Sequence, residues 1–456
     1  MHLHLNGRDE RGKKRGRTCS ERLRVESYIR RSRTVRHGWR SVEKHGRCTV
    51  EKQKGHRTHS GWRRVTAAMI SRWSRRYVLV SAVFLTGWQA GVVVGIPRRT
   101  EVVLGLFGFV LHVIFGKAYS LVPTYFDRTV AFPYAPAVQF PLVAVGTGGL
   151  VASSLGVGPP WTGAAGAILW CLGIGTFLFT LAWTIRENPT GRETATGDAN
   201  AERRPVDRLA NGFVPVALLY LLIGAYETLA VYTALPPFLD GYPPQVTHLL
   251  AAGTAGVMLF ALGFRMLPRF MVAHPPRWPV GVVLSTGAVG PVLLAAGLGS
   301  GWLFQLGALV QAVAVAGFAT AVGTLYIRSD RRRVGFYGVL AGAGFGVLAI
   351  TLGLLFAFSR MLPSLVRAHL RLNLLGFLGL TIVGVTYQFY PPAVGNLPGA
   401  SNRSAFYSVI ALAGGLLAQL VGIGAGAPPL TNLGHVLALG GSLLFLYLIV
   451  AALDAR

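Results

Sequence analysis

Apolar runs of about 20 residues, the length of a helix that crosses about 30 Å of hydrocarbon, recur with short breaks from Tyr77 to the C-terminus. Because hydrocarbon offers no hydrogen-bond partner, each run must satisfy its own backbone, as a helix does. A membrane β-barrel would instead alternate polar and apolar residues. The sequence therefore predicts an all-α, polytopic integral membrane protein.

The composition agrees with this fold class. Of the 456 residues, 52% are hydrophobic and 13% are charged, which is too few charged side chains to cover a soluble domain of this size. Twelve transmembrane helices are predicted, at about 77–96, 102–122, 139–157, 163–185, 213–234, 246–267, 279–298, 302–327, 335–357, 369–390, 405–425 and 433–453. Proline pairs such as Pro159-Pro160 and Pro391-Pro392 fall where a helix must end.

Basic residues predict the orientation of these helices. Most loop arginines follow even-numbered helices, whereas the opposite connections around 157–162, 235–245, 299–301 and 427–432 contain no basic residue. Basic loops stay in the cytoplasm. We therefore expect a multi-pass protein of the plasma membrane with cytoplasmic N- and C-termini, the lipid bilayer as its main partner, and a flexible cytoplasmic linker at 186–211.

The N-terminal segment differs from the rest. Residues 1–68 carry 20 Lys or Arg against 6 acidic residues, and six of the eleven histidines, without apolar periodicity, so composition predicts a basic disordered arm. We expect the cellular protein to start at Met69, with 69–456 as the membrane domain and no nucleic-acid partner. Peptides from residues 20–60, found by mass spectrometry, would contradict this start. The alternative is a translated arm that binds anionic lipid or nucleic acid.

Five histidines lie beyond this arm, and four of them occupy even-numbered helices. His248, His369 and His435 open the sixth, tenth and twelfth predicted helices, and His112 lies midway along the second. An imidazole is costly in hydrocarbon unless it is paired or ligated, which makes these residues functional candidates. For each histidine alone, the alternative is contact with interfacial water.

The second and tenth predicted helices resemble each other. At an offset of 268 they share seven identities in eighteen positions, among them Gly108 with Gly376 and Gly116 with Gly384. Such matches indicate either a repeated architectural element or only the small residues that let helices approach closely.

The tenth predicted helix resembles a known family. It opens with His369, continues as a Gly-rich apolar run and closes on Tyr390-Pro391. This is similar to the tenth helix of heme-copper oxidase catalytic subunits, particularly the nitric oxide reductase and cbb3-type branch, in which two histidines two residues apart open the helix. The helix count and the histidines near one membrane side also resemble that family and the NnrS-type heme-copper membrane proteins. The resemblance implies a heme-copper-oxidase-like bundle.

The resemblance also implies roles for three histidines. His369 would be a heme iron ligand, and His112 the helix 2 partner of a low-spin heme. His248 would be the helix 6 ligand of the second metal, with His369 as the other metal-site histidine. The chain departs from the family, since Arg371 stands where the second histidine is expected, and His248 is not followed by Pro-Glu-Val-Tyr. Copper or non-heme iron needs about three good ligands, so we expect neither.

One or two axial histidines suffice for heme iron. The resemblance therefore implies a heme-binding or cofactor-reduced relative, linked to nitric oxide, heme or electron transfer, with a redox protein as partner. In such a protein His112, His248 and His369 should face one cavity in the outer half of the membrane. Arg367 and Arg371 would lie at its mouth, where Arg suits heme propionates. Contact with lipid headgroup phosphates is the alternative for both arginines.

Glu227 is the acidic residue that lies well inside a predicted span. A carboxyl in that position is protonated or paired, so it could move a proton or couple transport. A secondary transporter with this intramembrane carboxylate is the alternative function, and a hydrogen bond to a neighbouring helix is the structural explanation.

The predicted topology can be tested with single cysteines in a form of the protein that lacks its three natural ones. Cysteines at Thr196 and at Gly241 should react with impermeant reagents from opposite membrane sides, because an odd number of spans separates a basic loop from a loop without basic residues. Labelling of both from the same side would overturn the twelve-helix topology.

Overall fold

The computed structural model describes residues 40–44, 47–51, 57–299, 301–359 and 361–455, with side chains from residue 66 onward. The chain forms two compact units, Met1–Arg64 and Val65–Arg456. In the first unit β1 (Arg40–Lys44) pairs antiparallel with β2 (Arg47–Glu51). These strands, and a helix that already begins at Arg57, differ from the disorder expected over 1–68. The rest of that arm lies outside the described residues.

The second unit is all-α in the part that the structure describes. Its described residues contain twelve helices that are long and apolar enough to cross a membrane and no strand. These helices overlap all twelve predicted ranges. The chain is thus a multi-pass membrane protein that resides in a lipid bilayer, and its membrane unit is all-α.

The spans are numbered 1 to 12 in chain order. Spans 1 to 4 are formed by α2 (Arg57–Val94), α3 (Arg98–Val102) with η1 (Val103–Val110) and α4 (Leu111–Tyr125), α5 (Ala135–Ser154), and α6 (Thr162–Ile185). Before span 5 come η2 (Asp198–Arg203) and α7 (Arg204–Gly212). Spans 5 to 8 are formed by α8 (Val214–Tyr232), α9 (Pro243–His248) with η3 (Leu249–Gly256) and α10 (Val257–Met271), α11 (Arg277–Ala296), and α12 (Gly301–Arg328). Spans 9 to 12 are formed by α13 (Val334–Phe358), α14 (Pro363–Arg371) with η4 (Leu372–Leu380) and α15 (Thr381–Phe389), which η5 (Pro392–Val394) follows, α16 (Asn402–Gly424), and α17 (Pro428–Asp454).

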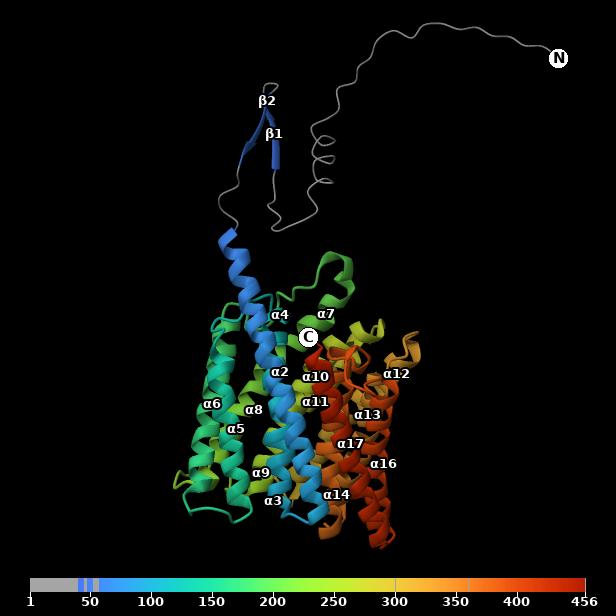
Figure 1. Ribbon diagram of the computed structural model, residues 1–456. Helices are drawn as coiled ribbons and strands as arrows, with labels where there is room; N and C mark the ends of the chain where they lie inside the picture. Colours follow the sequence, from blue (N-terminus) through green and yellow to red (C-terminus); the bar gives the residue numbers. More distant parts are fainter. Residues whose placement is uncertain (1–39, 45–46, 52–56, 300, 360, 456) are drawn as a thin grey trace, which may run out of the picture. The chain divides into compact units, whose positions relative to one another are not determined.

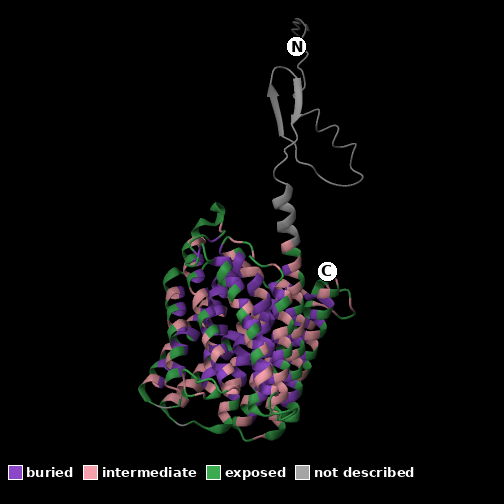
Figure 2. Ribbon diagram, turned by 90° about the vertical axis from the view of Figure 1, so that its left-hand side faces the viewer, coloured by how far each residue is buried: buried purple, intermediate pink, exposed green. Residues whose placement is uncertain are grey.

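Figure 1 shows the spans standing upright side by side. The short helices α3, α9 and α14 lie at one end of the bundle, and α7 and the C-terminus lie at the other. We call these the α14 end and the α7 end. Buried residues concentrate in the interior of the bundle, and exposed ones line its outer surface and both ends (Figure 2). An apolar outer surface is expected where lipid is the solvent.

Spans 2, 6 and 10 form the centre of the bundle. In their most apolar windows 83%, 72% and 72% of the residues are buried, against 56% or less in the other nine spans. Among the described residues these are also the spans that contain a π-helical segment, namely η1, η3 and η4, and each of these segments contacts the other two. The fold thus repeats a four-helix unit three times, with the second helix of each unit at the centre.

The remaining helices complete the three units in an equivalent way. Spans 3 and 4, spans 7 and 8, and spans 11 and 12 each pack as a helical hairpin. Small residues allow this packing, since a side-chain carbon on Gly146 would lie 2.6 Å from the Trp170 backbone of the facing helix, and one on Gly415 would lie 2.7 Å from the Ala438 backbone. Close backbone approach of this kind replaces the hydrophobic effect as the source of helix association in lipid.

The similarity of helices 2 and 10 has a packing basis as well as an architectural one. A side-chain carbon on Gly116 would lie 2.5 Å from Tyr77 of span 1, and one on Gly384 would lie 2.3 Å from the Gly335 carbonyl of span 9. The matched glycines therefore face the first helix of their own unit. Both explanations of the similarity, a repeated architectural element and small residues for close helix approach, therefore apply.

The segment 186–211 is ordered instead of a flexible linker. Asn188 Nδ2 donates to the Phe126 carbonyl at 3.0 Å, and Asn211 Nδ2 donates to the Tyr125 carbonyl at 2.8 Å. Asp207 of α7 also pairs with Arg269 of α10. The segment is polar because these side chains bind the ends of spans 2 and 6, and polarity alone does not distinguish such docking from a free linker.

Replacement of Gly384 by alanine should destabilise the bundle by about 1–3 kcal/mol, since the new methyl group overpacks the contact with α13. Gly344→Ala is the matched control on α13, because a side-chain carbon there meets no atom within 4 Å. It should be neutral or stabilising by up to about 1 kcal/mol. Thermal unfolding in detergent measures both, and equal behaviour of the two variants would argue against the close approach of spans 9 and 10.

Candidate functional site

His248 and His369 lie near each other at the α14 end. His248 is the last residue of α9 and directly precedes η3, His369 lies three residues before η4, and η3 and η4 contact each other. The Nδ1 atom of His248 bonds to the Pro244 carbonyl at 2.8 Å, and that of His369 bonds to the Ala349 carbonyl at 3.0 Å. Since a carbonyl can only accept, Nδ1 carries the proton in both rings and Nε2 presents its lone pair. This is the tautomer that binds metals through Nε2.

The Nε2 atom of His369 has one neighbour of its own. Asn373 Nδ2 lies 3.2 Å from it and also donates to the His369 carbonyl at 2.9 Å. The ring of Phe356 packs edge-on against the imidazole at a centroid distance of 5.5 Å. An iron atom at this Nε2 would therefore have to displace the Asn373 amide.

His112 occupies a separate, aromatic environment. It is fully buried, with the rings of Tyr77, Phe84 and Phe115 at centroid distances of 6.1, 5.2 and 6.4 Å. Its Nδ1 bonds to the Phe107 carbonyl in η1 at 2.8 Å. The amide of Leu111 reaches five residues back in this wide turn, to Leu106. His112 thus satisfies a carbonyl that the π-helical turn displaces from the ordinary α-helical ladder.

The expected convergence of three histidines is not found. Among the described residues, no group of three or more His, Cys, Asp or Glu side chains is placed to share a metal ion. His248 and His369 lie at the same end of spans 6 and 10, whereas His112 faces span 1. His112 therefore lacks the position that a shared cavity with the other two would require.

A buried ion pair joins spans 2 and 10 at the α14 end. Glu101 of α3 is fully buried. Arg371 of α14 donates two hydrogen bonds to its carboxylate, from Nε at 2.8 Å and from Nη2 at 2.9 Å. The Nη1 atom of Arg371 donates to Gln419 of α16 at 3.0 Å and to Nε2 of His435 of α17 at 2.9 Å. The Arg371 side chain is therefore bonded to three other spans of the protein.

Two further side chains complete this cluster. Trp88 Nε1 of span 1 donates to Glu101 at 3.4 Å, and Arg367 lies 3.5 Å from the same carboxylate with 44% of its side chain exposed. Bidentate Arg–carboxylate geometry gives strong and directional bonds. Glu101 therefore holds both arginines that the resemblance assigns to heme propionates.

This cluster bears on the fit of a low-spin heme. Such a group between helices 2 and 10 needs one imidazole from each helix across a gap that admits a porphyrin. Here Arg371, two residues after His369, binds span 2 directly, and His112 is enclosed by aromatic rings. The residues present do not fit a low-spin heme held by His112 and His369.

Glu227 of α8 is fully buried and supports a loop. Its Oε1 accepts from the amides of Phe238 at 2.7 Å and Leu239 at 3.2 Å, in the connection between spans 5 and 6. Its Oε2 is buried without a hydrogen-bond partner in the part of the chain that the structure describes. One oxygen thus has a structural role in holding the loop, and the other has no such role.

A second buried ionic cluster lies at the α7 end. Arg265 of α10 donates to the Tyr125 carbonyl at 2.7 Å and to Asn211 at 2.6 Å, and its Nε lies 3.4 Å from Asp207. Asp207 also receives two bonds from Arg269. This cluster joins α7 to spans 2 and 6, so span 2 is held at both of its ends by buried charges.

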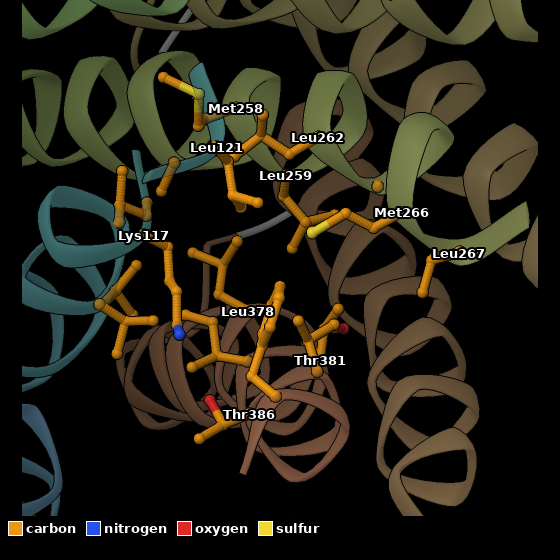
Figure 3. A pocket seen from close by; sticks show the side chains of 18 of the residues that line it. Lys117, Leu121, Met258, Leu259, Leu262, Met266, Leu267, Leu378, Thr381 and Thr386 are labelled. Carbon is orange, nitrogen blue, oxygen red and sulfur yellow. The ribbon is translucent and has the colours of Figure 1, made fainter. Parts of the chain in front are cut away.

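A cavity of about 80 Å³ lies between the three central helices, in their halves toward the α7 end. All but three of its lining residues are apolar, and the exceptions are Lys117, Thr381 and Thr386. Figure 3 shows Lys117 reaching from α4 toward α15, where its Nζ donates to the Tyr390 hydroxyl at 2.9 Å and lies 4.2 Å from the Phe389 ring centre. The cavity is thus in the opposite half of the bundle from His248 and His369.

Glu101, Arg265 and Lys117 were not predicted as site residues, although each carries a signal in the sequence. Glu101 precedes the predicted start of helix 2 by one residue, so the prediction places it at the end of the span and not inside it. Arg265 and Lys117 fall inside predicted spans, where a charge indicates a functional or structural partner. The contact of Glu101 with Arg371 joins positions 270 residues apart, which a single sequence does not reveal.

Comparison of the chain with models of known protein families and with curated proteins finds no match. The geometry of its own side chains therefore carries the functional argument.

Removal of one charge from the Glu101–Arg371 pair should cost about 3–5 kcal/mol, because the partner is left as an uncompensated buried charge. We expect this for Glu101→Leu and for Arg371→Leu, and a much smaller loss for the double variant, in which neither charge of this pair remains. The readout is the free energy of unfolding in detergent.

The exposed pair Arg186–Glu187, with side chains 49% and 64% exposed, provides the control for this cycle. Loss of that pair should change stability by less than about 1 kcal/mol. Additive effects of Glu101→Leu and Arg371→Leu would show that the two side chains do not depend on each other.

Proposed function

We propose that this protein is a heme-copper-oxidase-like membrane protein with a reduced ligand set, concerned with nitric oxide, heme or electron transfer. The single observation that carries the proposal is the pair His248 and His369, on central spans 6 and 10. Both imidazoles donate from Nδ1 to a backbone carbonyl, so both offer Nε2 to a ligand.

The arrangement of the spans supports the same proposal. The resemblance requires helices 2, 6 and 10 to converge, and spans 2, 6 and 10 are the most buried and contact one another through their π-helical segments. Fold-level similarity does not by itself assign a function. It is consistent with the position of His248 and His369 at the same end of spans 6 and 10.

The ligand set favours at most one heme. His369 would provide the axial nitrogen, and His248 would lie beside it. A bound heme supplies an iron centre for gas binding or electron transfer. Arg371 and Glu101 would take the place of the second heme site, and a redox protein would be the partner. The surviving chemistry is therefore simpler than that of an oxygen-reducing binuclear centre.

We further propose that the α7 end faces the cytoplasm and that the protein resides in the plasma membrane. The loops at the α7 end contain most of the loop arginines, including Arg203, Arg204 and Arg208 next to α7. Basic segments of this kind are retained on the cytoplasmic side.

A secondary transporter is the second candidate, and one observation favours it. Glu227 has a buried carboxylate oxygen without a partner among the described residues, which suits a group that binds and releases a proton. Its other oxygen accepts a hydrogen bond from an amide of the loop after span 5, so a change in protonation would alter that hydrogen bond. Transport that is lost in Glu227→Gln, in protein without heme, would favour this candidate.

The test of the heme proposal is the optical spectrum of protein purified after expression with added heme. Wild-type protein should show a heme absorption band, and His369→Ala should lose it. Asn373→Ala should keep or strengthen the band, because it removes the amide that competes for His369 Nε2.

His274→Ala is the matched control, because His274 is an exposed histidine between spans 6 and 7 with 48% of its side chain accessible. This variant should retain the wild-type spectrum. A wild-type protein without heme, or a full heme band in His369→Ala, would contradict the proposal.

A further inference from the structure

We infer that the cavity between spans 2, 6 and 10 is a binding site for a small, uncharged, apolar molecule of gas size. The cavity lies where the three repeated units meet, toward the α7 end of the bundle. It is separate from the histidine pair, so the inference does not depend on the proposed function.

Two of the three polar side chains of the wall are already bound to the protein. Lys117 donates to the Tyr390 hydroxyl and lies over the rings of Phe389 and Tyr390. The Thr381 hydroxyl donates to the Phe377 carbonyl at 2.6 Å. A water molecule in a protein interior needs two to four polar partners, and the Thr386 hydroxyl, the remaining polar group of the wall, does not provide them.

Several residues that line the cavity are partly exposed although they belong to the most buried helices. Leu259 of span 6 and Ile382 and Val385 of span 10 are only partly buried, although each lies on a central span. All three line the cavity. Their exposure marks space that side chains of the protein leave unfilled.

The size of the cavity limits the ligand. A dry apolar cavity of about 150 Å³ accepts benzene or xenon, and a single water needs about 10–15 Å³. The present volume of about 80 Å³ lies between these values. The site therefore suits molecules smaller than benzene, such as a dissolved diatomic or noble gas, and it excludes ions because an unpaired charge is costly in an apolar wall.

Xenon is the probe for this site. In crystals of the full chain pressurised with xenon, an anomalous peak should lie between Leu259 and Leu378. Leu259→Phe, which fills the cavity, should abolish this peak. Leu219→Phe is the matched control, since Leu219 is 55% exposed on the outer surface of span 5, and it should keep the peak.

Two further measurements test the same site. If Leu259→Phe does not fold, Val385→Leu adds one methylene to the same wall and should lower the xenon occupancy. Bromide soaked into wild-type crystals should give no peak beside Lys117. A bromide peak there, ordered water filling the cavity, or xenon bound only at the lipid-facing surface would overturn the inference.

Discussion

The absence of hydrogen-bond partners in hydrocarbon is the constraint on which the rest of this structure depends. Each span must satisfy its own backbone, yet spans 2, 6 and 10 each contain a π-helical segment in which carbonyls leave the regular ladder. Side chains of the protein then supply the missing bonds, as His112 does for Phe107. The three irregular segments lie against one another in the interior, where lipid never reaches them.

Buried charge in this protein links helices to each other. Glu101 and Arg371 connect span 2 to span 10, and through Gln419 and His435 they also hold spans 11 and 12. Taking both charges out of water costs several kcal/mol each, and only good geometry and further hydrogen bonds offset this. The pair therefore contributes specificity of helix arrangement more than net stability, and it occupies the contact in which a second cofactor would have to fit.

The fold was largely predictable from the sequence, and the site was not. Hydropathy and length determine spans in lipid, so all twelve predicted ranges overlap observed helices. The π-helical segments left no such signal. A central helix is apolar on every side, and a change in its backbone hydrogen-bond pattern from α to π does not alter its hydropathy. Segment 186–211 resembled a free linker because the residues that dock it, such as Asp207 and Asn211, are polar in either case. The partner of Arg371 lies too far along the chain for local patterns to indicate it.

Each π-helical segment also changes the direction in which the following half of its span faces. One additional residue in a turn rotates everything after it by roughly 100°, the angle per residue of an α-helix. The α14-end halves of spans 2, 6 and 10 can thus present one set of side chains inward while the α7-end halves present another. Loss of a single residue within Val103–Val110 would restore an unbroken helix, and would turn Lys117 away from the cavity without altering its chemistry. Insertions and deletions in these short stretches would consequently be as damaging as substitutions of the cavity wall itself.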